Sequence, residues 1–61
     1  MLIRLTQANS LGGKLSPMII NTDLVEAVRP EPDGVTALEM ASGHTRWITE
    51  SVEEYWKLAK P

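Results

Sequence analysis

Two short glycine turns, Asp33-Gly34 and Ser42-Gly43, most constrain how this chain folds. Glycine readily adopts the positive φ that a tight reversal needs. A tight turn joins only antiparallel neighbours, because parallel strands need a long crossover. The turns separate three segments of strand composition: 24–29, 35–40 and 44–48. The spacing therefore predicts consecutive antiparallel strands, with Leu24, Val25 and Val28 as the buried members of the first segment.

The N-terminal third predicts two more strands. In segment 2–6 apolar and polar residues alternate, which is typical of a strand with one buried face. Segment 17–20 begins with Pro17, a residue that a strand start or a sheet edge tolerates. The connection between the two contains Gly12-Gly13, which predicts either a tight hairpin turn or a loose loop. Asn and Asp in segment 21–23 favour a turn or a single helical turn.

The C-terminal segment predicts a short helix. Ser51 and Glu54 have the spacing of a capping box, in which each side chain satisfies the other's free backbone N–H. An apolar stripe at helical spacing follows: Val52, Tyr55, Trp56 and Ala59. A helix of two turns is not stable alone and must pack on the sheet. The predicted fold is one α+β domain spanning residues 1–61, a small antiparallel β-meander of about five short strands with one C-terminal helix on one face.

Composition limits the ways in which this fold can be stabilised. A chain of 61 residues buries only about 60% of its unfolded surface. It has no cysteine, which excludes disulfides, and its one histidine cannot supply the about four ligands of a structural zinc site. We therefore expect no cofactor and no metal, and we expect a homo-oligomer, since a partner subunit is the remaining common means of stabilising so small a domain.

Charge and hydropathy argue against several classes of partner. The net charge is −2, and the six Lys and Arg residues are scattered along the chain. A nucleic-acid-binding domain normally carries a basic footprint, so nucleic acid is not the expected partner. No apolar run approaches the roughly 20 residues that span a bilayer, and no signal peptide is evident. We expect a cytoplasmic protein without membrane insertion.

Candidate catalytic groups have simpler structural explanations. Glu50, Glu53 and Glu54 lie at the predicted helix start, where carboxylates complement the dipole and cap the helix. His44 follows a turn and has no adjacent Ser or Cys, and no serine lies in a nucleophile-elbow pattern. We therefore expect no catalytic residue and no enzyme.

Trp47 and Arg46 are the candidate protein-interface residues. Trp47 precedes Ile48 on a strand, so the two side chains point to opposite faces and only one can face the helix. If Ile48 is buried, Trp47 either forms a contact surface, where Trp is a frequent anchor, or lies half-buried across its strand neighbours. Arg46, its neighbour on the same strand, is included in the candidate interface.

Several short strings occur in an order seen in a known family: Ile3-Arg4-Leu5-Thr6, Asn21-Thr22-Asp23-Leu24-Val25-Glu26, Pro32-Asp33-Gly34-Val35 and Ser51-Val52-Glu53-Glu54. They resemble the small flagellar-motility proteins of the FlbD/SwrD type, and small phage and prophage proteins share the layout. The chain departs from that family in several features: the segment 9–17 is longer than its Asn-Gly hairpin, Arg46 replaces an apolar residue, and the C-terminal tail is short.

The resemblance implies a cytoplasmic accessory that supports flagellar motor power or swarming, without catalytic residues. The expected function is accordingly a non-enzymatic accessory that acts through protein–protein contacts, with a flagellar motor protein or another protein as partner. The alternatives are a nucleic-acid-binding regulator and a phage or prophage protein of other role.

Overall fold

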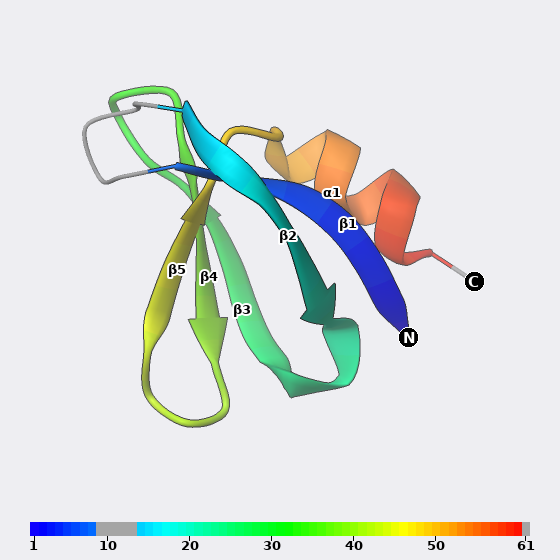
Figure 1. Cartoon of the computed structure of the whole chain (residues 1–61). Coiled ribbons are helices and arrows are strands. Elements are labelled where there is room, and N and C mark those ends of the chain that lie inside the picture. The colour runs from blue at the N-terminus through cyan, green and yellow to red at the C-terminus, as the bar shows by residue number, and fades with distance from the viewer. Residues whose placement is uncertain (9–13, 61) are drawn as a thin grey trace.

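The computed structural model describes residues 1–8 and 14–60 and shows a five-stranded antiparallel sheet with one C-terminal helix (Figure 1). The predicted α+β fold class is confirmed. Gly12-Gly13, predicted as a tight turn or a loose loop, lies outside the described residues. The elements, in chain order, are β1 (Leu2–Ala8), β2 (Lys14–Asn21), the 3₁₀ helix η1 (Thr22–Leu24), β3 (Val25–Pro30), β4 (Thr36–Met40), β5 (Thr45–Ile48) and α1 (Val52–Ala59).

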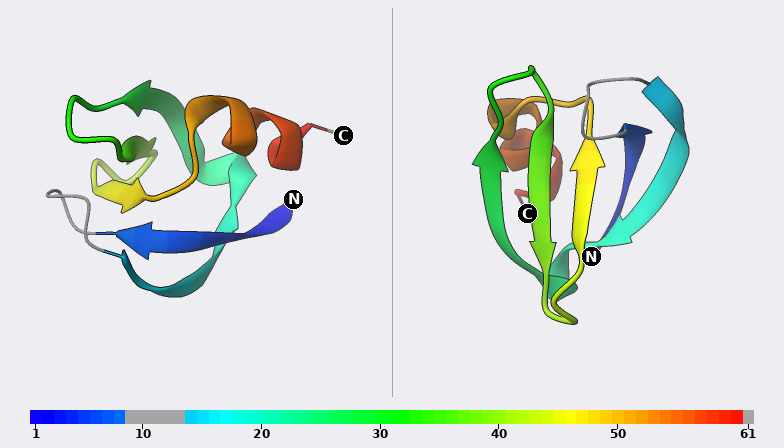
Figure 2. Two further views of the ribbon diagram at one scale, coloured as in Figure 1. Left: turned by 90° about the horizontal axis from the view of Figure 1, so that it is seen from above. Right: turned by 90° about the vertical axis from the view of Figure 1, so that its left-hand side faces the viewer.

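The strands lie in the order β2-β1-β5-β4-β3. Strands β3, β4 and β5 form the predicted meander, and β1 and β2 form a hairpin. The two units are joined by a pairing that the sequence analysis did not anticipate, in which Gln7 and Ala8 of β1 lie opposite Ile48 and Trp47 of β5. Seen from above, the sheet curls into a trough, and α1 lies across its open side (Figure 2).

The turn and cap signals have the predicted local effects. Gly34 and Gly43 both have positive φ, of 87° and 93°. Asn21 caps η1, because its Oδ1 accepts the Asp23 N–H at 3.1 Å. This confirms a helical turn at residues 22–24.

The capping box of α1 is also confirmed. The Glu54 N–H donates to Ser51 Oγ at 3.1 Å, and the Ser51 N–H donates to Glu54 Oε1 at 2.8 Å. These two bonds satisfy backbone donors that the first turn of a helix otherwise leaves unpaired. The start of α1 at Val52 is thus set by Ser51 and Glu54, which lie within three residues of each other in the sequence.

The core lies between the concave face of the sheet and α1. Its fully buried large side chains are Leu5, Leu38 and Ile48, and Ile3, Ile20 and Tyr55 complete the buried cluster. Tyr55, a member of the predicted apolar stripe, is the buried residue of α1 and packs in the core cluster. Burial raises the pKa of its phenol above the ordinary value of 10.

Two predicted core residues are exposed, which corrects the sequence analysis. Trp56 is 64% exposed, and Leu24 is 52% exposed. Trp56 belongs to the apolar stripe of α1, but one layer of side chains under a two-turn helix accommodates Tyr55 and leaves the neighbouring position at the margin. Leu24 lies in η1, which precedes β3, whereas Val25 and Val28 of β3 pack against the core as predicted.

Glu50 has a different role from the predicted one at the helix start. Both of its carboxylate oxygens accept the backbone N–H of Thr6 in β1, at 2.9 and 3.0 Å. The Thr49 N–H donates to the Thr6 C=O at 3.0 Å. Together these bonds extend the β1–β5 ladder beyond Ile48, so Glu50 connects the two halves of the sheet.

Candidate protein interface

Trp47 lies half-buried on the convex face of the sheet, while its neighbour Ile48 is fully buried on the concave face. Trp47 pairs with Ala37 on β4 and with Ala8 on β1, and both alanines are buried although neither of the described helices covers this face. Paired residues have Cβ atoms about 5 Å apart on the same face, so the indole is placed to shield both methyl groups. Trp47 is therefore half-buried within the single chain, and its use as a contact surface stays a prediction.

Arg46 lies on the opposite face from Trp47. Its strand partner is Leu38, and both belong to the concave face, where Arg46 lies at the open end. The two predicted interface residues therefore do not form one continuous patch. Whether either residue contacts another protein stays a prediction.

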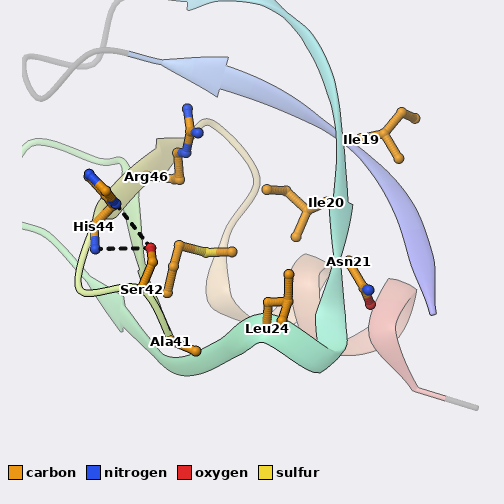
Figure 3. Close-up of a pocket in the computed structure, with 9 residues that line it drawn as sticks. Ile19, Ile20, Asn21, Leu24, Ala41, Ser42, His44 and Arg46 are labelled. Atoms are coloured by element: carbon orange, nitrogen blue, oxygen red, sulfur yellow. Dashed lines mark hydrogen bonds between the residues drawn. The ribbon is translucent and has the colours of Figure 1, made fainter.

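Arg46 borders a cavity of about 340 Å³ at the open end of the trough, between β2 and the β4–β5 turn (Figure 3). Ile20, Leu24 and Met40 contribute apolar side chains to it. Figure 3 shows Ile19 pointing away from the cavity, as alternation along β2 requires. The cavity is an opening at the end of the core, with a polar rim formed by Ser42, His44 and Arg46.

Ser42 and His44 form a contact within this rim. Ser42 Oγ lies 3.0 Å from His44 Nδ1, and the His44 backbone N–H donates to the same oxygen at 3.5 Å. A serine is activated by histidine when a third group orients the imidazole. In the part of the chain that the structure describes, the hydrogen-bond contact of the His44 imidazole is with Ser42, and both residues are exposed in a turn. The geometry is that of a turn-stabilising contact, and the absence of enzymatic activity remains a prediction.

Several exposed apolar residues mark surfaces that were not predicted from the sequence. Leu2 and Ile19 are 69% and 61% exposed and lie on the convex face of β1 and β2, while Trp56 lies on α1. For Ile19 the signal was present in the adjacent pair Ile19-Ile20, because strand alternation lets only one of the two face a core that lies on one side. Tyr55 and Trp56 gave no such signal, since adjacent residues of a helix are about 100° apart and both fit the apolar stripe.

Trp56 stands beside a groove between α1 and β3. One hollow of about 460 Å³ is lined by Val25, Val28, Val52, Tyr55 and Trp56, among others. Two adjoining hollows share Val52 with it and continue along the helix. The groove is mostly apolar, and it runs along β3, the edge strand of the sheet.

Neither a metal centre nor a membrane-spanning segment is found in residues 1–8 and 14–60. This part of the chain contains no cluster of three or more His, Asp or Glu side chains that could hold a metal ion. Its helices are also too short and too polar to span a bilayer.

Comparisons of the chain with protein-family models, curated proteins and solved structures found no match. The resemblance to flagellar-motility proteins of the FlbD/SwrD type therefore stays a prediction from short strings of residues.

Proposed function

We propose that the protein is a non-enzymatic accessory that acts by binding protein, including other copies of itself. The observation that carries this proposal is the position of the exposed apolar side chains. Each open edge of the sheet has one beside it: Ile19 lies on β2, and Trp56 lies next to β3. Small soluble domains rarely leave contiguous apolar surface beside an unpaired edge unless another protein covers it.

The convex face of β1 and β2 is the surface that we assign to self-association. Leu2 and Ile19 are diagonal neighbours, because Leu2 pairs with Asn21 and Ile19 pairs with Arg4. Side chains in this relation lie about 7–8 Å apart, within reach of one apolar contact. A symmetric dimer would place two such pairs against each other.

Light scattering and sedimentation equilibrium over micromolar concentrations test self-association. The expected mass exceeds the 6.8 kDa of one chain and falls to that value in Ile19→Lys. Leu58→Lys is the matched control, because Leu58 is 48% exposed on α1, distant in sequence from β2, and receives the same new charge. A wild-type chain that stays monomeric at every concentration would refute self-association.

Trp47→Glu and Arg46→Ala test the interface predicted from sequence. Loss of association in Trp47→Glu, with a folded chain, would move the contact to the convex face of β5. An unchanged mass would leave Trp47 as a cover for Ala8 and Ala37. The proposed cellular role is support of flagellar motility, and it is tested by deleting the gene: swarming should decrease and return with the wild-type gene, and unaffected motility would refute the flagellar role.

A further inference from the structure

We infer that the groove between β3 and α1 binds an extended, basic segment of another protein, which adds to the sheet as a sixth strand. This inference rests on the protein-binding function proposed above and specifies a second surface for it. The partner segment would carry Lys or Arg residues alternating with apolar residues. Three properties of the groove lead to this partner: a free strand edge, an apolar wall and an acidic rim.

The first property is the free edge of β3. The Glu31 N–H donates to the Val35 C=O at 2.9 Å, which sets the phase of the β3–β4 ladder. Arg29, paired with Ala37, then directs its N–H and C=O toward β4. Because these groups alternate in direction along a strand, the N–H and C=O of Val28 point away from β4. No strand lies beyond β3 in the described sheet, so these groups face the groove side.

The second property is the apolar wall that α1 provides. Val52 and Trp56 lie along the helix beside β3, and Trp56 is 64% exposed. A strand added next to β3 would direct every second side chain toward this wall. Main-chain hydrogen bonds to an edge together with pockets for alternate side chains are the general mode of strand addition. In this groove Val28 supplies free main-chain groups, and Trp56 forms part of the apolar surface for alternate side chains.

The third property is the charge of the rim. Glu26, Glu31 and Glu53 line the hollows of the groove. Among the described residues, the salt bridges join other groups: Met1 to Asp23 and Arg29 to Glu39. Lys57 borders the adjoining hollow as the one basic side chain of the lining. Three acidic side chains beside an apolar wall complement a segment with Lys or Arg at its exposed positions.

The same rim disfavours a second copy of this chain as occupant. Two-fold pairing of two β3 strands through their outward groups would place Val28 opposite Val28 of the second copy. Glu26 would then lie opposite Pro30 of that copy, next to its Glu31. Such pairing would bring the acidic rims of both copies, each with Glu26, Glu31 and Glu53, to one seam, and like-charge juxtaposition across an interface is unfavourable. The groove therefore suits a different, basic partner better than it suits itself.

The test uses a synthetic nine-residue peptide that alternates lysine and valine, with both ends blocked, added to the full chain. Amide hydrogen exchange by NMR reports on the Val28 N–H. We expect the peptide to slow exchange at this amide and to bind more weakly as salt is raised. A peptide with glutamate in place of lysine should not bind, and a lysine–valine peptide with alternate backbone nitrogens methylated should lose binding.

Matched variants locate the site. Trp56→Ala removes an exposed side chain and should weaken peptide binding by about tenfold, the scale of an interface anchor. Leu58→Ala truncates another exposed residue of α1 that does not line the groove, and it should leave binding unchanged. Unchanged exchange at the Val28 N–H in the presence of the peptide, or equal binding of the glutamate peptide, would overturn the inference.

Exchange at the Val28 N–H that is already slow without peptide, and that speeds up on dilution, would also overturn the inference, because it would show a second copy in the groove. The Ile19→Lys experiment probes the opposite edge of the sheet. Failure of the peptide test with a positive Ile19→Lys result would therefore remove this inference and leave the proposed function in place.

Discussion

Replacing Glu50 by alanine should destabilise the fold more than any other single change to a charged residue of α1 or the segment before it. The Glu50 carboxylate accepts the Thr6 N–H through both oxygens, in a partly buried setting. Alanine would leave that N–H without an acceptor at the junction of β1 and β5. The pairing of these strands in the ladder is short, at Gln7 and Ala8, so the junction has little to compensate for the loss.

The magnitude follows from the kind of bond. Hydrogen bonds to charged groups contribute about 1.5–3 kcal/mol to stability, and partial exposure favours the lower half of that range. Stabilities of about 0.05–0.15 kcal/mol per residue give a chain of 61 residues about 3–9 kcal/mol in total. A loss of about 2 kcal/mol would lower Tm by about 8–16 °C.

Urea denaturation followed by far-UV circular dichroism measures this loss. Glu50→Gln is the informative companion, because its amide oxygen still accepts the Thr6 N–H while the charge is removed, so its loss should be about half as large. Glu53→Ala is the control, since Glu53 is exposed at the first turn of α1 and should lose about 0.5 kcal/mol. The reasoning is refuted if Glu50→Ala and Glu53→Ala unfold at the same urea concentration, or if Gln is as harmful as Ala.

Three further outcomes are expected. Tyr55→Ala should cost about 3–5 kcal/mol in a urea melt and Trp56→Ala less than about 1 kcal/mol, because only the first side chain is buried; a reversed order would show that α1 packs through Trp56. The raised pKa of Tyr55 means that its stabilising contribution is complete below pH 10 and is lost as pH rises from 10 toward the higher folded-state pKa; the alkaline decrease in stability should be smaller in Tyr55→Phe, and an identical decrease would contradict this. Gly43→Ala should cost about 1–2 kcal/mol in thermal unfolding, since an L-residue is strained at φ 93° although nothing lies within 4 Å of the new Cβ; unchanged stability would indicate that the turn relaxes freely.

The elements that sequence predicted well depend on neighbours within about four residues. The capping box of Ser51 and Glu54, the Asn21 cap and the two glycine turns each act on backbone groups close by in sequence. These caps and turns can therefore be predicted from a few consecutive residues. For the same reason the start of α1 and the antiparallel order of the meander strands followed from the sequence alone.

The features that sequence did not predict depend on distant pairing. The bond between Glu50 and Thr6 joins residues 44 positions apart, and no local pattern distinguishes Glu50 from Glu53. The exposure of Trp56 depends on where the sheet ends beneath α1. An amphipathic stripe shows which side of a helix faces the core, but its marginal residue is decided by the width of the surface that it packs against.

The candidate interface illustrates the same division. Strand alternation correctly placed Trp47 and Ile48 on opposite faces, but it did not show that Ala8 and Ala37 flank Trp47 from both sides. Because both neighbours are small, the indole of Trp47 can lie over them on the convex face of the sheet. Arg46 was grouped with Trp47 by adjacency in sequence, although adjacency on a strand puts the two on opposite faces.

The two prolines of the edge strands bear on how this sheet meets other proteins. Thr6 directs its N–H and C=O toward Glu50 and Thr49, so Pro17, which pairs with Thr6, directs its nitrogen toward the open edge of β2. Pro30 pairs with Thr36 in the same phase and directs its nitrogen toward the open edge of β3.

Each free edge thus has a position that cannot donate a hydrogen bond, which is a common protection against indiscriminate strand pairing. Long ladders between copies are disfavoured at both edges. Self-association of this chain should therefore use side chains such as Ile19, while the β3 edge is restricted to a short segment whose register is set at Val28 and Pro30.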